Sequence, residues 1–176
     1  GTMLWTQRAH DSTGATGASI FDFDADEVPV VVYIDEVAMY AYNGTDGTLK
    51  FKSEEHDSVT MFDYPVVADV DGDGHADIIV ADEGTYGLVV YQDATNSWAP
   101  ARSVWNQHAY SITNINDDLS VPVTATPNFT LYNNYHAALE TIDGQALSEE
   151  LQSEILDVCE EDCDSGKLHV WGRGLN

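Results

Sequence analysis

An acidic segment with aspartates at alternate positions is the part of the sequence best suited to chemistry. It spans residues 69–77 and reads DVDGDGHAD. Ca²⁺ takes about 6–8 oxygen ligands, and carboxylates at the first, third and fifth positions of such a loop can converge on one point. A backbone carbonyl at the seventh position and a carboxylate at the ninth add further oxygens. The segment therefore predicts a calcium site formed by Asp69, Asp71, Asp73, the carbonyl of His75, and Asp77.

Two alternatives to this site are an EF-hand and an acidic turn without metal. An EF-hand needs a bidentate glutamate at the twelfth position and flanking helices, but that position holds Val80 within the apolar run IIVA. The loop is therefore predicted to lead into a β-strand. A turn without metal would bring four like charges close together, at a cost on the order of several kcal/mol. We favour the calcium site.

A second copy of the acidic pattern lies 47 residues earlier in the chain. It differs in two ways, because Glu27 stands at a glycine position and Val30 stands where the closing carboxylate is expected. This copy is predicted to bind calcium more weakly, with Glu27 or a water molecule in place of the missing ligand. Its predicted ligands are Asp22, Asp24, Asp26 and the carbonyl of Val28.

A third, degenerate copy offers two neutral amides and no closing acid. It begins at Asn114 and continues through Asn116 and Asp118, with Ser120 and Pro122 at the later positions. Amides are weaker ligands for a hard cation than carboxylates. This copy is predicted to keep the turn without an ion.

The acidic segments belong to a longer internal repeat. Residues 18–35 align with residues 65–82 at an offset of 47, and His10 aligns with His56 at an offset of 46. Runs of Val, Ile, Tyr and Phe between Gly, Asp and Asn indicate short strands. A unit of about 46 residues with four short strands is the size of one propeller blade. The predicted fold class is all-β, with repeats at about 18–64 and 65–110 and a degenerate one at 111–135.

The DxDxDGxxD loop that leads into a short strand, repeated every 46–47 residues, resembles the FG-GAP/VCBS repeats of integrin-like and bacterial surface β-propellers. The resemblance covers residues 1–125. It implies one calcium ion per loop, with ligands at loop positions one, three, five, seven and nine, and an extracellular structural or adhesive role. It also implies a partial propeller of about three blades.

Residues 136–176 are predicted to form a C-terminal extension outside the repeats. Residues 154–159 and 167–172 indicate a β-hairpin, and the segment is similar to the opening of an Ig-like module. Cys159 and Cys163 lie four apart around its turn, where they form either a local disulfide or two unrelated thiols. Asn43 and Asn128 both fit the N-glycosylation acceptor pattern.

The net charge limits the kinds of partner that the protein can bind. Six Lys and Arg stand against 31 Asp and Glu, which gives a net charge of −25 at pH 7. Such a surface repels nucleic acid and anionic membranes, and no apolar run reaches the roughly 18 residues that a membrane span needs. Together with the disulfide spacing and the calcium loops, the charge favours a secreted or cell-surface protein.

The sequence contains no recognised catalytic motif. No GxSxG, HExxH, P-loop or GxGxxG pattern is present, and we predict that the chain is not an enzyme. The segment WNQHAY at residues 105–110 is interpreted as core between blades. The alternative function is a carbohydrate-binding, lectin-like module, in which Trp98 or Trp105 would contact the glycan.

The number of predicted blades suggests the kind of partner. Closed propellers use about 4–8 blades, whereas this sequence provides about three. Either the chain is a fragment of a larger ring, or several copies complete one another. Unsealed blades leave edge strands that can pair with another chain. We therefore expect a homo-oligomer or filament through β-edges, with glycans or surface proteins as further partners.

Overall fold

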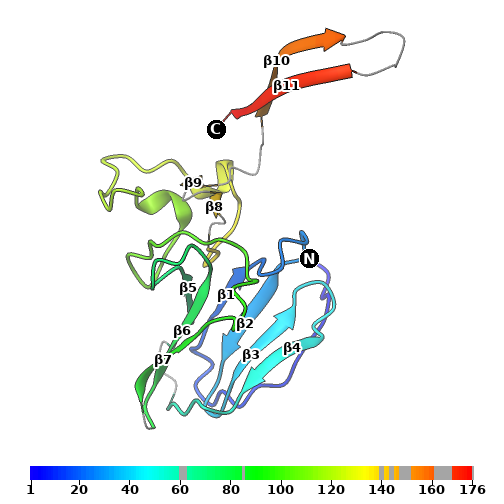
Figure 1. Cartoon of the computed structure of the whole chain (residues 1–176). Coiled ribbons are helices and arrows are strands. Elements are labelled where there is room, and N and C mark those ends of the chain that lie inside the picture. The colour runs from blue at the N-terminus through cyan, green and yellow to red at the C-terminus, as the bar shows by residue number, and fades with distance from the viewer. Residues whose placement is uncertain are drawn as a thin grey trace. The chain divides into compact units, whose positions relative to one another are not determined.

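The computed structural model describes residues 1–59, 63–84 and 86–138, together with the backbones of four short segments that follow, 141–142, 145–146, 152–160 and 168–175. The chain divides into two compact units, Gly1–Ala146 and Leu147–Asn176. The first unit contains a four-stranded, a three-stranded and a short two-stranded antiparallel sheet, and among the described residues its helices are two single 3₁₀ turns (Figure 1).

The first sheet is a four-stranded antiparallel meander. Its strands are adjacent in the order of the sequence. Strand β2 alternates buried and half-buried residues, so that Val30, Val32 and Ile34 face the core, as a strand with one covered face requires. The four strands are β1 (Ala18–Phe21), β2 (Val30–Ile34), β3 (Met39–Asn43) and β4 (Leu49–Ser53).

The second sheet repeats the first three strands of the first sheet. Its strands β5 (Val66–Ala68), β6 (Asp77–Asp82) and β7 (Gly87–Tyr91) pair in sequence order. They lie about 47 residues after β1, β2 and β3, as the repeat predicts. The position of a fourth strand, residues 96–100, is irregular, and β7 is therefore an edge strand among the described residues.

One hydrophobic core joins the two sheets. It takes buried residues from strands of both sheets and from the segment after β7. Trp98 lies in that segment and packs on Phe23 of the first repeat, with ring centroids 4.8 Å apart. The main buried side chains of this core are Phe21, Phe23, Val30, Val32, Ile34, Met39, Val67, Ile78 and Val80.

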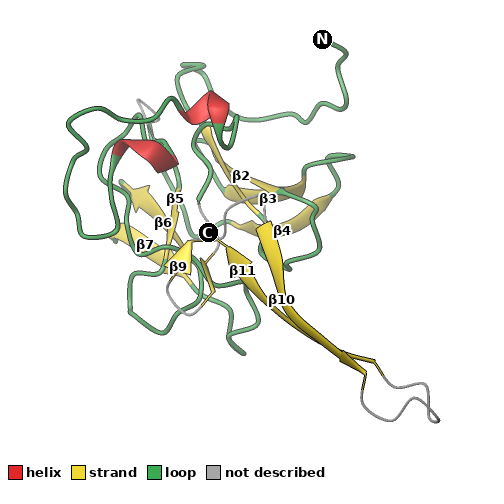
Figure 2. Ribbon diagram, turned by 90° about the horizontal axis from the view of Figure 1, so that it is seen from above, coloured by secondary structure: helices red, strands yellow, loops and turns green. Residues whose placement is uncertain are grey.

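Residues 100–138 form loops around a second, smaller core. Two short 3₁₀ turns of this region are drawn in red in Figure 2. The smaller core contains Val104, Tyr110, Ile112 and Ile115. Residues 111–135, the predicted third repeat, contain no strand, and they hold the 3₁₀ turns η1 (Ile112–Asn114) and η2 (Asn128–Thr130).

Arg102 organises this loop region from inside. The guanidinium donates to the carboxylate of Asp117 at 2.5 Å, to the carbonyl of Ile112 at 3.1 Å and to the carbonyl of Ile115 at 2.7 Å. Only 7% of Arg102 is exposed. A buried charge with its donors satisfied fixes the path of a loop that has no ladder of its own. The arginine thus does for this region what strand pairing does for the sheets.

The second unit contains the predicted hairpin. Strand β10 (Gln152–Glu160) pairs antiparallel with β11 (Leu168–Leu175), with a register shift between Ile155 and Asp157. A shorter ladder of β8 (Thr141–Ile142) and β9 (Gln145–Ala146) ends the first unit. Cys159 lies in β10 opposite His169, whereas Cys163 lies outside the described residues. The disulfide therefore stays a prediction.

Candidate metal site

The shape of the loop between β5 and β6 is fixed by hydrogen bonds from its backbone amides to its own aspartate side chains. Gly72 and Gly74 have φ angles of 81° and 91°, a region that glycine enters without strain. The amides of both glycines turn inward and donate to the carboxylate of Asp69, at 2.7 and 3.2 Å. The amide of Asp73 donates to Asp71 at 3.0 Å. The loop therefore wraps around its own aspartates.

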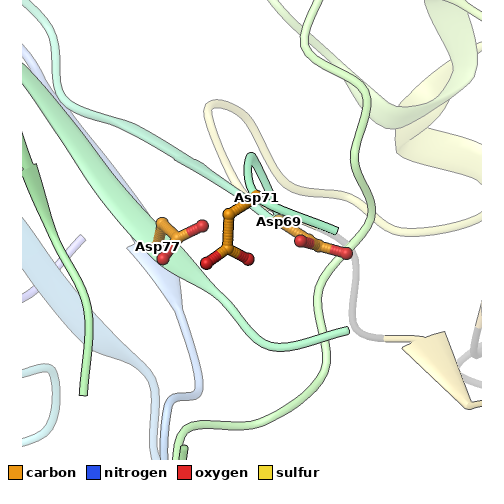
Figure 3. Close-up of side chains that lie close together, drawn as sticks. All are labelled: Asp69, Asp71 and Asp77. Atoms are coloured by element: carbon orange, nitrogen blue, oxygen red, sulfur yellow. The ribbon is translucent and has the colours of Figure 1, made fainter. Parts of the chain in front are cut away.

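Three carboxylates converge inside this wrap. Asp69, Asp71 and Asp77 each offer an oxygen, and these oxygens all lie within 4.8 Å of one another. Figure 3 shows Asp69 and Asp71 on the loop and Asp77 at the start of β6. Oxygens bound to one Ca²⁺ at about 2.3–2.6 Å lie within roughly 5 Å of one another. The spacing of the three carboxylates fits a single calcium ion.

The electrostatics of Asp77 also favour a cation. Only 2% of Asp77 is exposed, and its Oδ2 accepts the amide of Val70 at 2.9 Å. Burial raises the pKa of this carboxyl group above its usual value, against the lowering effect of that hydrogen bond, and the neighbouring Asp71, Asp73 and Asp69 raise it further. Without a cation, the ionised form of Asp77 lowers the stability of the folded protein. A bound divalent ion would offset this loss of stability.

The other two predicted ligands have identifiable contacts. Asp73 lies outside the group of three, and its carboxylate accepts the amide of His75 at 2.8 Å and the side chain of Gln92 at 3.1 Å. The ring of His75 donates to the carbonyl of Trp98 at 2.6 Å. The Nδ1 atom of this ring is therefore occupied, and the backbone carbonyl is the predicted metal ligand of His75.

Gln92 is a residue of this site that the sequence analysis missed. Its side-chain amide donates to Asp71 at 3.0 Å and to Asp73 at 3.1 Å. It follows the edge strand β7, 19 residues beyond Asp73 in sequence. No motif marks a residue at that distance, so only the strand pairing of β6 with β7 reveals it.

The first loop has the same backbone but not the same cluster. The amide of Glu27 donates to Asp22 at 2.7 Å and that of Val28 to Asp26 at 2.9 Å, which matches the bonds of the second loop. Asp24 instead forms an ion pair with Lys50 of β4. Within the described parts of the chain, the group of Asp69, Asp71 and Asp77 is the only one of three or more such side chains. Calcium at the first loop stays a prediction.

The third copy forms a closed polar turn. The amide of Asn116 donates to the carbonyl of Ser120 at 2.9 Å, and its side chain donates to the hydroxyl of Ser120 at 2.8 Å. Asp118 accepts from the amide of Ser120 at 2.9 Å. The side chains that would face an ion thus bond to the turn itself.

The predicted glycosylation positions lie in turns. Asn43 ends β3, and its side-chain oxygen accepts the amide of Thr45 at 2.9 Å and the hydroxyl of that residue at 2.6 Å. Asn128 begins η2 and exchanges hydrogen bonds with Asn134 at 3.2 and 3.3 Å. Glycosylation at either position stays a prediction.

The two tryptophans of the alternative function have different surroundings. Trp98 packs into the main core against Phe23. Trp105 stacks on Tyr110 with ring centroids 4.2 Å apart, and it is only half-buried. Trp105 thus packs beside the smaller core, whereas the sequence analysis interpreted the segment 105–110 as core between blades.

A buried aspartate recurs in each repeat, and the sequence analysis gave it no role. Asp35 is fully buried and accepts the amides of His10 at 2.8 Å, Val37 at 3.0 Å and Ala38 at 3.0 Å. In the next repeat Asp82 is 4% exposed and accepts the amide of Asp57 at 2.9 Å. The recurring Asp-Glu dipeptide at these positions was the available signal.

These bonds correct one sequence alignment. The amide of Glu36 donates to the carbonyl of His10, and the amide of Glu83 donates to the carbonyl of Asp57. His10 is therefore equivalent to Asp57, 47 residues later, and pairing His10 with His56 was wrong by one residue. The similar letters HDS at both places produced the error.

Comparison with known proteins agrees with this architecture. Residues 22–80 match the family model of the FG-GAP-like repeat. The crystal structure of the V. cholerae biofilm matrix protein Bap1 is similar with a TM-score of 0.65 and 27% sequence identity, over 72% of this chain. The match spans 22% of that structure, so this chain corresponds to about a fifth of it. No curated protein sequence matches the chain.

The same comparison supports the predicted fold class. The four-stranded and three-stranded sheets of the first unit, together with the repeat match over residues 22–80, are consistent with FG-GAP-type blades. Among the residues that the structure describes, no helix is long and apolar enough to cross a membrane.

Proposed function

Since residues 22–80 of the chain are an FG-GAP-like repeat, we propose that the chain is a calcium-stabilised structural module of an extracellular adhesive protein. The observation that carries this proposal is the convergence of Asp69, Asp71 and Asp77 within 4.8 Å, with Asp77 buried. One buried carboxylate beside a half-buried and an exposed one at this spacing fits a hard divalent cation. Calcium is the cation that extracellular fluids supply in excess.

The proposed role of the ion is structural and not catalytic. The loop joins β5 to β6, and Asp77 is the first residue of β6. An ion bound there would connect two neighbouring strands across their turn, and it would stabilise the folded state by mass action. We propose no enzymatic activity for the chain.

The kind of site supports the proposed extracellular location. Calcium sites of extracellular modules have dissociation constants of roughly 10⁻⁴–10⁻³ M, which requires a medium with abundant calcium. The net charge of −25 suits such a medium, because dissolved salt and bound cations screen it. The similarity to a biofilm matrix protein supports an adhesive or structural role.

We also propose that copies associate through the edge of the second sheet. Strand β7 has no partner on its outer side among the described residues, and it exposes Leu88 by 60% and Val90 by 48%. Exposed apolar side chains on an unpaired edge invite another strand. A second copy of this chain, with its own free edge or with the hairpin of β10 and β11, is the proposed partner.

A calcium titration tests the metal site. Isothermal titration calorimetry in physiological salt should give a dissociation constant of roughly 10⁻⁴–10⁻³ M for the unmodified chain. Asp71→Ala should remove the binding heat of this site. Asp46→Ala is the matched control, because Asp46 is also exposed and accepts an amide in a turn, that of Thr48 at 2.9 Å. Equal binding by Asp71→Ala and the unmodified chain would exclude the site.

Light scattering tests the association. The unmodified chain should give a mass above 19.3 kDa that rises with concentration. Val90→Lys should shift the population toward the monomer, since a charge on an edge strand opposes edge pairing. Val121→Lys is the control, because Val121 is 71% exposed but lies in a loop. A monomer at every concentration would refute the association and leave the metal site untouched.

A further inference from the structure

A pocket of about 310 Å³ lies beside the smaller core of the first unit. Its size is at the lower end of the range for small-molecule sites, which is about 300–1,000 Å³. No residue of the acidic loops lines it. Its walls combine aromatic, amide and imidazole side chains, those of Tyr64, Trp105, Asn106, Gln107, His108 and His136.

His136 is a polar group of this pocket whose hydrogen bonds are not satisfied. Only 1% of the residue is exposed, and neither ring nitrogen has a hydrogen-bond partner of normal geometry. Its backbone is fixed, because its carbonyl accepts the amide of Ile20 at 2.9 Å. The ring's one polar contact, with the backbone of His108, lies outside normal hydrogen-bond geometry, and such a buried imidazole is costly unless something enters to bond with it. The ring is thus held in place for a ligand or ordered water.

The aromatic walls of the pocket are also held in place. Trp105 stacks on Tyr110 at 21° between the rings, and Tyr110 is 1% exposed. The ring of Tyr64 lies 4.8 Å from that of His136. Gly17 makes room for Tyr64, because a Cβ at position 17 would come within 1.6 Å of its ring. Such support positions the two aromatic rings before any ligand arrives.

We propose that this pocket binds one neutral sugar ring of a glycan. Aromatic rings cover the apolar C–H face of a sugar, and amide and imidazole groups both donate and accept hydrogen bonds, as sugar hydroxyls do. The lining contains no Asp, Glu, Lys or Arg side chain that would pair with a charged ligand. The net charge of −25 further disfavours an anionic ligand.

The protonation of His136 agrees with a neutral ligand. Burial lowers its pKa, and the charge of the nearby His108 ring lowers it further, while a contact with the His108 backbone acts in the opposite direction. A neutral imidazole offers one donor and one acceptor. This is the pairing that a hydroxyl group can satisfy.

The test uses the whole chain with saturating calcium and four neutral probes, the methyl glycosides of glucose, galactose, mannose and N-acetylglucosamine. Saturation-transfer NMR should show contact with one face of at least one sugar, with an affinity roughly in the millimolar range for a ligand of this size. Nitrogen spectra of the imidazoles should show a shift of the His136 signals in the same titration. Glucuronate and galacturonate should bind at least tenfold more weakly.

Two variants locate the binding. Asn106→Ala and His108→Ala should each weaken it about fivefold, the effect of one lost hydrogen bond, and His10→Ala should leave it unchanged. His10 is the matched control, because both histidines are exposed and His10 lies in the N-terminal segment. An absence of contact and shift with all four sugars would overturn the proposal. Equal losses in His10→Ala and His108→Ala, or equal binding of the acidic sugars, would overturn it as well.

Discussion

The acidic loops of the two repeats share a backbone and differ in chemistry. In both loops, the amide at the sixth position donates to the aspartate at the first position. The amide of Gly74 donates to Asp69, and the amide of Glu27 donates to Asp22. Only the second loop brings three carboxylates together. The difference teaches that the first and fifth aspartates shape the loop through its own amides, whereas the ninth position decides whether a cluster forms.

The first loop keeps its shape at a conformational cost. Ala25 and Glu27 have φ angles of 51° and 65° at the positions that Gly72 and Gly74 occupy in the second loop. A residue with a Cβ pays about 1–2 kcal/mol in this region. Lys50 adds an ammonium group beside Asp24. In the first repeat, a lysine side chain thus neutralises part of the acidic loop. In the second repeat, the carboxylates form a cluster that suits a metal ion.

The largest expected effect comes from transferring the second loop's chemistry to the first. Val30→Asp with Glu27→Gly should lower the stability without calcium by about 3 kcal/mol, because Val30 is 3% exposed and a buried carboxylate replaces it. With calcium, the variant should gain one binding site by calorimetry and recover part of its melting temperature. Val32→Asp should be destabilised without recovery. A double variant with no added site would break the comparison.

Chelation should have the next largest effect. With calcium at 10 to 100 times the dissociation constant, binding stabilises the fold by about 1.4–2.7 kcal/mol. EDTA should therefore lower the melting temperature by roughly 3–10 °C, measured by circular dichroism. In Asp71→Ala, EDTA should lower the melting temperature by much less than in the unmodified chain. An unchanged melting curve of the unmodified chain would count against the metal assignment.

The effect of Asp77→Asn on the melting temperature should have opposite signs with and without calcium. Without calcium, the raised pKa of Asp77 means that its ionisation destabilises the fold as pH rises past the usual value of 3.8. The asparagine variant should therefore melt slightly higher than the unmodified chain at pH 7 in EDTA, and the gap should close below pH 3.8. With calcium, the carboxylate is a ligand and the variant should melt lower. A variant that melts lower under both conditions would contradict this sign.

The smallest effect is that of the glycine positions. Glu27→Gly alone should stabilise the chain without calcium by about 0.5–1 kcal/mol, because it removes backbone strain. Gly72→Ala should destabilise the chain by about 1 kcal/mol, because it introduces the same backbone strain. No atom lies within 4 Å of the added Cβ, so no steric clash adds to this strain. Urea titration at neutral pH measures both changes. Changes of the same sign in the two variants would show that the loops do not share this backbone.

The sequence predicted the parts of the molecule that repeat. The offset of 47 placed β5, β6 and β7 on β1, β2 and β3, and the predicted acidic loop includes the three residues whose carboxylates converge, Asp69, Asp71 and Asp77. Alternation and turn residues encode such elements locally. The hairpin of β10 and β11 was found in the same way.

The residues that sequence reasoning missed act over longer distances. Gln92 reaches the acidic cluster only because β7 pairs with β6, and His136 reaches its pocket because its backbone bonds to Ile20 of β1. Arg102 fills a place that only the folded loops define. No local pattern marks such positions, because each depends on a contact between distant segments.

The buried aspartates Asp35 and Asp82 affect how the module would respond to mechanical load. Each takes an amide from the stretch of chain ahead of its own sheet, from His10 and Asp57 respectively. Tension along the polypeptide would therefore pull on a part-buried, charge-assisted bond before it could peel a strand away. A module anchored at this point would resist extension one sheet at a time.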